Sequence, residues 1–110
     1  MLRKGFRLTK KEDFDRVFQR GKPLFFGEIA CRIAPNDLSH IRLGFSFTKK
    51  HLNLATDRNK LRRIISAPFE SATIEGRGMD VVFFTVKKPK IINSKTFRPI
   101  VESIIEHISH

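Results

Sequence analysis

The sequence predicts one α/β (α+β) domain whose elements run helix, two or three strands, helix, strand, helix. Apolar residues recur at helical spacing in three segments, and they alternate or run continuously over strand lengths in the segments between. No linker rich in Gly, Ser or Pro and no internal repeat divides the 110 residues. A chain of this length is usually one domain and can bury a core. We therefore expect a single folding unit over residues 1–110.

The first helix is expected near residues 10 to 20. Thr9 and Glu12 have the spacing of a capping box, in which each side chain bonds a free backbone N–H at the helix start. The apolar face that follows carries Phe14, Val17 and Phe18. Gly21 then supplies a natural end to the helix.

Strands are expected in three segments. Leu24 to Ala34 is rich in apolar residues that alternate in its second half, and it can hold two short strands broken at Gly27. Residues 41–48, IRLGFSFT, alternate cleanly and give the clearest strand. Residues 79–86, MDVVFFTV, form a continuous apolar run, which is typical of a central strand covered on both faces. The loop before this run is marked by Gly76 and Gly78.

A basic helix is expected within residues 48–69, where six of 22 residues are Lys or Arg and Asp57 is the single acid. At a helical step of about 100° per residue, one side is apolar and carries Leu54, Leu61, Ile64, Ile65 and Phe69. The opposite arc carries Asn59, Lys60, Arg62 and Arg63, with Arg58 on its edge. We expect the apolar side to face the core and the basic arc to lie along a polyanion. Asn53 is expected to cap the start, and Pro68 to end or kink the helix near Ser66 or Ala67.

The last helix is expected from Ser94 onward. Its apolar stripe carries Ile100, Val101, Ile104, Ile105 and Ile108, and Glu102 and Glu106 lie off the stripe. We expect the stripe to pack on the sheet.

The charge of the chain requires an acidic partner. The formal net charge is +11 and the sequence pI is about 10.6, and nucleic acid is the commonest partner of so basic a protein. A membrane surface is the rival, but no stretch approaches the roughly 20 apolar residues that span a bilayer. The first residues also lack the apolar region of a signal peptide. We therefore expect a cytoplasmic protein that binds nucleic acid.

Residues for protein-borne catalysis are not grouped in the sequence. Phosphodiester hydrolysis by a protein normally needs carboxylates that hold metal ions about 4 Å apart. The closest group of acids is Glu12, Asp13 and Asp15, and the four histidines have no metal-ligand spacing. Cys31 lies in an alternating apolar run, as a buried thiol does. We expect no metal site and no catalytic residue in the protein.

Four segments resemble a known family. They are RLTKKEDFDRVFQRG (residues 7–21), RLGFSFTKK (42–50), DRNKLRR (57–63) and GMDVVFFTVKKP (78–89). In order and spacing they resemble the protein subunit of bacterial ribonuclease P, over nearly the whole chain.

The resemblance implies a two-layer α/β (α+β) sandwich of order αβββαβα with a mixed sheet of about four strands. It also implies a left-handed crossover through the basic helix, whereas such connections are generally right-handed. Proteins of this family join a catalytic RNA and help it remove the 5′ leader of precursor tRNA. The implied partners are ribonuclease P RNA and precursor tRNA, without DNA or membrane, and Mg²⁺ is implied to be bound mainly by the RNA and the substrate. The free protein is expected to be a monomer.

Two groups of site residues are expected. The RNA-binding residues are Lys49, Lys50, Arg58, Asn59, Lys60, Arg62 and Arg63, of which Arg58, Asn59 and Lys60 resemble the family's Arg-Asn-Arg signature. The resemblance implies a cleft for the leader that uses Phe14, Phe18 and the exposed side of the strand at Ala30 and Arg32. Leader bases can stack on Phe14 or Phe18, and packing of both rings in the core is the alternative.

Three places differ from the family's usual pattern. Lys60 stands where Arg is usual, which keeps the charge but loses the planar fork that holds phosphate. Arg32 stands where many relatives have an aromatic residue, although a guanidinium can also stack on a base. Residues 66–68 replace a stretch that usually includes Arg and Glu, so no RNA contact is assigned beyond Arg63.

Other classes of protein stay open at this point. A ribosomal or general RNA-binding protein can use the same basic helix without a catalytic RNA. A self-sufficient nuclease needs acids such as Glu12, Asp13 or Asp15 to carry the reaction. A helix-turn-helix DNA-binding protein fits less well, because its basic helix follows another helix, whereas here it follows a strand.

Overall fold

The structure, a computed structural model, describes residues 6–71 and 78–109. The helices are α1 (Lys11–Arg20), α2 (Ala55–Ser71) and α3 (Ser94–Ser109), and the strands are β1 (Lys22–Phe26), β2 (Ile29–Pro35), β3 (Arg42–Ser46) and β4 (Met79–Thr85). This order confirms the predicted sequence of elements. The loop expected at Gly76 lies outside the described residues.

The four strands form one mixed sheet in the order β1-β2-β4-β3. β1 pairs with β2 and β2 with β4 in antiparallel fashion, whereas β3 and β4 are parallel. β4 is therefore internal, and Val81, Val82 and Phe83 are fully buried, as its continuous apolar run predicts. Because β3 and β4 are parallel, the chain must cross over between them, and α2 makes that crossover. Its handedness stays a prediction.

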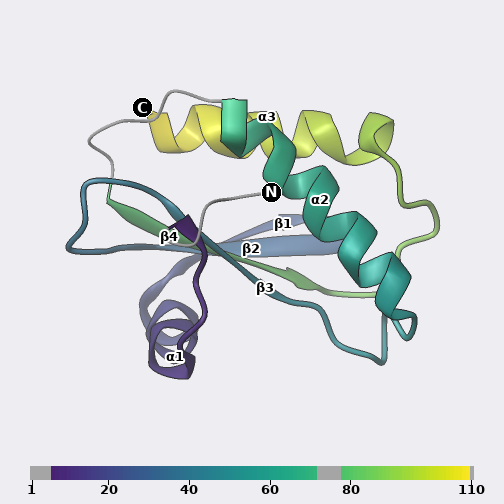
Figure 1. Cartoon of the computed structure of the whole chain (residues 1–110), viewed down its shortest axis with the longest axis horizontal. Helices are drawn as coiled ribbons and strands as arrows, with labels where there is room; N and C mark the ends of the chain where they lie inside the picture. Colours follow the sequence, from purple (N-terminus) through teal and green to yellow (C-terminus); the bar gives the residue numbers. More distant parts are fainter. Residues whose placement is uncertain (1–5, 72–77, 110) are drawn as a thin grey trace.

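Helices lie on both faces of the sheet (Figure 1). On one face, α2 and α3 cover the larger core, in which Leu61, Val101 and Phe83 are fully buried. On the other face, α1 covers a smaller cluster that includes Val17 and Val82. The predicted α+β sandwich with a mixed four-stranded sheet is confirmed, and α1 adds a helix on the second face.

The start of α1 differs from the expectation. The N-cap residue is Lys10, in an extended conformation and without a side-chain cap, so the predicted capping box of Thr9 and Glu12 is wrong. The segment before the helix is instead held in an extended form by β3, because the N–H of Leu8 donates to the carbonyl of Leu43 at 2.7 Å. The end of α1 at Gly21 is as predicted.

The start of α2 also differs. The helix begins at Ala55, and the N–H of Arg58 donates to the carbonyl of Leu54 at 3.2 Å. Leu54 is therefore the N-cap residue in place of Asn53. The side chain expected in the core at Leu54 is 56% exposed, because it lies before the first helical turn.

The far end of α2 runs past Pro68 to Ser71, so the helix does not end near Ser66 or Ala67. The kink, which was the other predicted outcome, stays a prediction. Proline lacks the N–H that would bond the carbonyl of Ile64, which costs the helix one hydrogen bond. Burial offsets this cost, since Phe69 is 9% exposed and its ring packs edge-on against Phe83 at 6.1 Å between centroids. The interior contact of Phe69 keeps the chain helical beyond the proline.

The stripe of α3 packs as predicted. Val101, Ile104 and Ile108 are buried in the larger core, and Ile100 and Ile105 pack against it. The described residues contain no helix long and apolar enough to cross a membrane.

Candidate nucleic-acid interface

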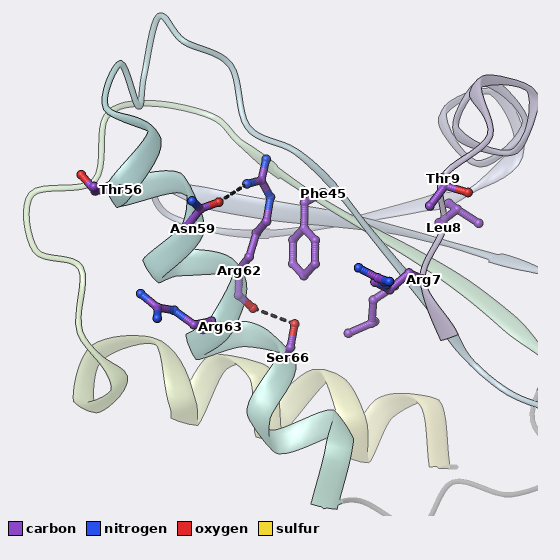
Figure 2. A pocket seen from close by; sticks show the side chains of 10 residues that line it. Arg7, Leu8, Thr9, Phe45, Thr56, Asn59, Arg62, Arg63 and Ser66 are labelled. Carbon is purple, nitrogen blue, oxygen red and sulfur yellow. Dashed lines mark hydrogen bonds between the residues drawn. The ribbon is translucent and has the colours of Figure 1, made fainter. Parts of the chain in front are cut away.

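One side of α2 and the edge of β3 enclose a pocket of about 610 Å³, which we call the α2–β3 pocket. Its lining residues are Arg7, Leu8, Thr9, Leu43, Phe45, Thr56, Asn59, Arg62, Arg63 and Ser66. Figure 2 shows the ring of Phe45 between Arg62 on one side and Arg7 on the other. The basic arc of α2 thus faces an apolar ring and a third arginine from the N-terminal segment.

Two local features build this pocket. Thr56, Asn59, Arg63 and Ser66 follow one another at three- and four-residue intervals, so they share one side of α2. The N-terminal segment runs beside β3 through a parallel bridge between Arg7 and Leu43. This pairing brings Arg7 to the pocket, although more than fifty positions separate it from Arg62 in the sequence.

The pocket is strongly basic. Three arginines line it, and its lining residues include no acid. The Nη1 of Arg62 donates to Oδ1 of Asn59 at 2.8 Å, which fixes the guanidinium beside the helix (Figure 2). The Ser66 hydroxyl donates to the carbonyl of Arg62 at 2.7 Å and is therefore used within the helix. An anion entering the pocket meets fixed positive charge without a competing carboxylate.

The other predicted RNA-binding residues lie outside the pocket lining. Lys49 and Lys50 are exposed in the turn after β3, and Lys60 is exposed on α2. Arg58 is half-buried, and its Nη1 donates to the carbonyl of Leu52 at 2.8 Å. Arg58 therefore ties α2 to the loop that precedes it, a role the sequence did not predict. Of the seven predicted residues, the structure brings Asn59, Arg62 and Arg63 together in the pocket.

The rings expected to bind a leader lie against the opposite face of the sheet. Phe14 and Phe18 are half-buried and pack against the cluster under α1. Gly44 leaves room for the ring of Phe14, because a Cβ at that position would lie 2.8 Å from its Cζ. Phe18 meets Phe84 edge-on at 5.6 Å between centroids. Both rings combine core packing with some exposed surface, so each of the two interpretations describes part of their environment.

The strand beside these rings is less open than expected. Ala30 is fully buried, so the expectation of an exposed surface at that residue is wrong. Arg32 is half-buried, and its Nη1 donates to the carbonyl of Gly21 at 3.2 Å, at the end of α1. Only Arg32 of this pair retains a surface that can meet a ligand.

Two further aromatic residues lie on this face, Phe84 and Phe25, and neither was predicted from the sequence. Phe25 pairs in register with Ala30, and Ala30 pairs with Phe84, so the three side chains form a row across β1, β2 and β4. Phe18 contacts Phe84, which places the row on the side of α1. Phe25 is 64% exposed, the largest exposure among the large apolar side chains that the structure describes. Only the strand register identifies Phe25 as part of this surface.

A buried carboxylate joins α1 to the sheet. Asp80 is the second residue of β4, and its side chain is 0% exposed. Arg16 of α1 pairs with it, and Nδ2 of Asn36 donates to its Oδ1 at 2.7 Å. Burial alone would raise the pKa of Asp80, but hydrogen bonds from Arg42 and Asn36 and the nearby charges of Arg42 and Arg16 lower it overall. The Asp80 side chain is therefore ionised and has a structural role. The only indication of this role in the sequence is the place of an acid within an apolar strand.

A model of the protein family described as Ribonuclease P matches residues 2–109 of this chain. The chain belongs to the ribonuclease P family. In this structure, the basic α2–β3 pocket lies on one side of the sheet, and the aromatic row of Phe25 and Phe84 lies on the other.

Curated relatives agree with the family. The ribonuclease P protein component of Legionella pneumophila (strain Corby) is 33% identical over 73 residues, which cover 66% of this chain and 64% of that protein. The ribonuclease P protein component of Histophilus somni (strain 2336) is 35% identical over 91 residues, covering 79% of this chain and 76% of that protein. The match with the Legionella protein thus spans slightly less than two thirds of its length.

The fold agrees as well. A mutant RNase P protein from Staphylococcus aureus, 25% identical, superposes with a TM-score of 0.80 over 94% of this chain and 88% of that chain. The role of each residue in the pocket and in the aromatic row stays a prediction.

Proposed function

We propose that this chain is the protein component of a ribonuclease P. In this proposal it binds the catalytic RNA and the 5′ leader of precursor tRNA, so that the RNA removes the leader and leaves the mature 5′ end. The observation that carries the proposal is the family match over residues 2–109. Two separate surfaces of suitable chemistry support it.

The α2–β3 pocket suits the catalytic RNA. Three arginines line it, and Lys49, Lys50 and Lys60 are exposed on α2 or in the turn that leads to it. Lys and Arg side chains that neutralise phosphates release bound counterions, so affinity falls steeply with salt. We assign the larger share of the binding free energy to this surface, because it holds the greater number of cations.

The face of α1 suits a single-stranded leader. Phe18 and Phe84 meet edge-on there, and Phe25 lies in the same register row. Stacking of a base on an aromatic ring tolerates every base, and each stack contributes about 1–3 kcal/mol. A surface of this kind suits a protein that must accept many leader sequences.

The protein acts in this proposal by positioning and by charge neutralisation. The Asp80 carboxylate is held by Arg42 and Asn36, and Asp13 lies 3.5 Å from Nη1 of Arg42. Both acids are engaged within the fold, and the reaction centre in this proposal lies in the RNA. Mg²⁺, bound mainly by the RNA and the substrate, would supply the charge stabilisation that phosphodiester hydrolysis needs. Because the protein's cations replace part of the screening by metal, we expect it to lower the Mg²⁺ that the RNA requires.

Cleavage of precursor tRNA tests the proposal. Purified ribonuclease P RNA is incubated with substrate at low Mg²⁺, with and without the protein, and the protein alone serves as the control. We expect cleavage at the mature 5′ end only when both are present. Equal cleavage with and without the protein would refute the proposal. In that case, comparable binding to an unrelated structured RNA would favour a general RNA-binding protein.

A further inference from the structure

We propose that the α2–β3 pocket holds one unpaired nucleotide of the partner RNA, with its base against the ring of Phe45 and its phosphate between Arg7 and Arg62. This inference rests on the proposed function, because it takes RNA as the partner. It goes further by giving the pocket a ligand of defined chemistry, whereas phosphate contacts along α2 need no pocket at all.

The floor of the pocket supplies an apolar plane. Leu8 and Leu43 are buried, and Phe45 is half-buried with its ring in the lining. The ring is backed by Phe83, nearly parallel at 22° with centroids 6.0 Å apart, and by Phe47 at 5.5 Å. Its position is therefore fixed before any ligand arrives. A rigid aromatic plane at the bottom of a pocket is a suitable surface for a nucleobase.

The rim supplies charge on both sides of that plane. Arg62 is held by Asn59, and Arg7 is carried by a segment that is hydrogen-bonded to β3. In Figure 2 these two arginines lie on opposite sides of Phe45, whereas Arg63 extends away from the ring. Arg7 and Arg62 are thus placed for the phosphate of the bound nucleotide, and Arg63 for a neighbouring phosphate of the same strand.

The walls supply polar groups for the edge of a base. Oδ1 of Asn59 accepts the hydrogen bond from Arg62, which leaves its amide N–H groups as donors. Thr9 and Thr56 add hydroxyl groups that can donate or accept. These groups surround the apolar floor, as the polar groups of small-ligand sites usually do.

The combination of an apolar ring with arginines on both sides distinguishes among possible anionic ligands. A duplex keeps its bases stacked inside and would offer only phosphates to the rim, leaving the apolar floor uncovered. An acidic peptide would satisfy the arginines but would lack a plane for Phe45. An unpaired nucleotide has both an aromatic plane and an adjoining phosphate, and a pocket of about 610 Å³ lies within the range of small-ligand sites, about 300–1,000 Å³.

A mononucleotide tests the pocket directly. We would titrate the protein with adenosine 5′-monophosphate and follow the backbone amide signals of Leu8, Phe45 and Asn59 by NMR, with adenosine and inorganic phosphate as parallel ligands. We expect the monophosphate to shift these signals and to bind at least about fivefold more tightly than either fragment, as one stacked base implies. Binding no tighter than that of inorganic phosphate would leave the arginines as a simple anion site and overturn the inference.

Binding of the whole RNA gives a second, independent test. Phe45→Leu keeps apolar volume but removes the aromatic plane. Phe97→Leu is the matched control, since Phe97 belongs to the same core cluster but does not line the pocket. We expect Phe45→Leu to weaken binding to ribonuclease P RNA about 5- to 100-fold at an unchanged salt slope, and Phe97→Leu to leave the affinity near that of the wild type.

The outcomes separate the two proposals. If the wild-type protein fails to bind or stimulate the RNA, the proposed function fails. If the wild-type protein does both and Phe45→Leu binds as tightly, only the nucleotide pocket fails. Thermal unfolding of both variants identifies any affinity loss that comes from misfolding, and an equal loss of affinity in Phe45→Leu and Phe97→Leu would also overturn the inference.

Discussion

Arg42 of β3 donates two hydrogen bonds to Asp80 of the adjacent parallel strand β4. Nη2 of Arg42 lies 2.7 Å from Oδ2 of Asp80, and Nε donates to Oδ1 at 2.8 Å. The two residues are register partners, and Arg16 brings α1 to the same carboxylate. Bidentate pairs of this kind are strong and directional. This buried acid therefore helps to hold α1, which carries Phe14 and Phe18, against the sheet.

Asp80→Asn should destabilise the protein. The substitution keeps the volume but removes the buried anion of Arg42 and Arg16, which retain the longer contacts with Asp13 at 3.5 and 4.0 Å. Loss of one partner from a buried pair costs about 3–5 kcal/mol, and we expect the lower end because both arginines retain some contact with water. Urea unfolding measures the change. Glu102→Gln is the control, because its pair with Arg98 is exposed and should contribute less than about 1 kcal/mol.

The lowered pKa of Asp80 predicts that the free energy of unfolding depends on pH. Because the pKa of Asp80 is lowered in the folded protein, its contribution to stability is complete above its unfolded pKa of about 3.9 and is lost as the pH falls toward the folded pKa. The free energy of unfolding of the wild type should therefore fall below about pH 4. The decline should be shallower in Asp80→Asn, and parallel curves for the two proteins would contradict this assignment.

Arg63→Ala should weaken RNA binding through charge alone. Arg63 is exposed, so stability should change by less than about 0.5 kcal/mol. The slope of log affinity against log salt should flatten by about 0.7–0.9 for one lost phosphate contact. Lys95→Ala removes one charge from an exposed position on α3 and should leave the slope unchanged. Filter binding over a salt series distinguishes the two.

Arg58→Ala should behave differently, although Arg58 belongs to the same basic segment. Its hydrogen bond to the carbonyl of Leu52 would be lost, with a cost of about 1 kcal/mol in the free energy of unfolding. Its effect on the salt slope should be smaller than that of Arg63→Ala, because part of its guanidinium is already used within the protein. A full slope change with unaltered stability would instead place Arg58 at a phosphate.

Phe25→Ala should reduce binding of precursor tRNA but not of mature tRNA. Phe25 is 64% exposed, so its loss tests stacking without disturbing the core, which is not true of the half-buried Phe14. We expect the affinity of the reconstituted particle for the precursor to fall by about 1 kcal/mol or more, that is about fivefold. Ile91→Ala is the matched control, being 59% exposed after β4. Equal losses with both forms of tRNA would remove Phe25 from the leader surface.

Cys31 should be unreactive in the native protein. It is fully buried, and burial raises the pKa of its thiol to about 12, so almost no thiolate is present at neutral pH. Iodoacetamide at pH 8 should leave the folded protein unmodified and should alkylate Cys31 once urea unfolds the chain. Rapid alkylation of the native protein, measured by mass spectrometry, would contradict the burial.

The sequence predicted the elements better than their contacts. The alternation near Ile41 and the run near Val82 were interpreted as strands correctly, because strand periodicity is written in neighbouring residues. The errors arose where distant segments compete with local signals. The backbone of Leu8 is hydrogen-bonded to β3, and the capping box of Thr9 does not form. Phe69 is buried, and α2 continues past Pro68.

The same limit applies to the candidate sites. The basic arc of α2 follows from helix geometry alone, so Asn59, Arg62 and Arg63 could be placed together from their spacing. Arg7 and Phe45 could not be added to them, because their place in the pocket depends on how the N-terminal segment and β3 pair. The burial of Ala30 depends likewise on what covers it from other elements.

By itself the sequence determined the class of the protein: an α+β domain with a basic helix, resembling one family along nearly its whole length. Only the tertiary structure decided which residues meet across the sheet, since strand register and helix docking are long-range contacts that no local pattern encodes. Strand register aligns Phe25 with Phe84 across Ala30. The buried Asp80 joins α1 to the sheet. The basic face of α2 forms one wall of a pocket with Phe45 at its floor.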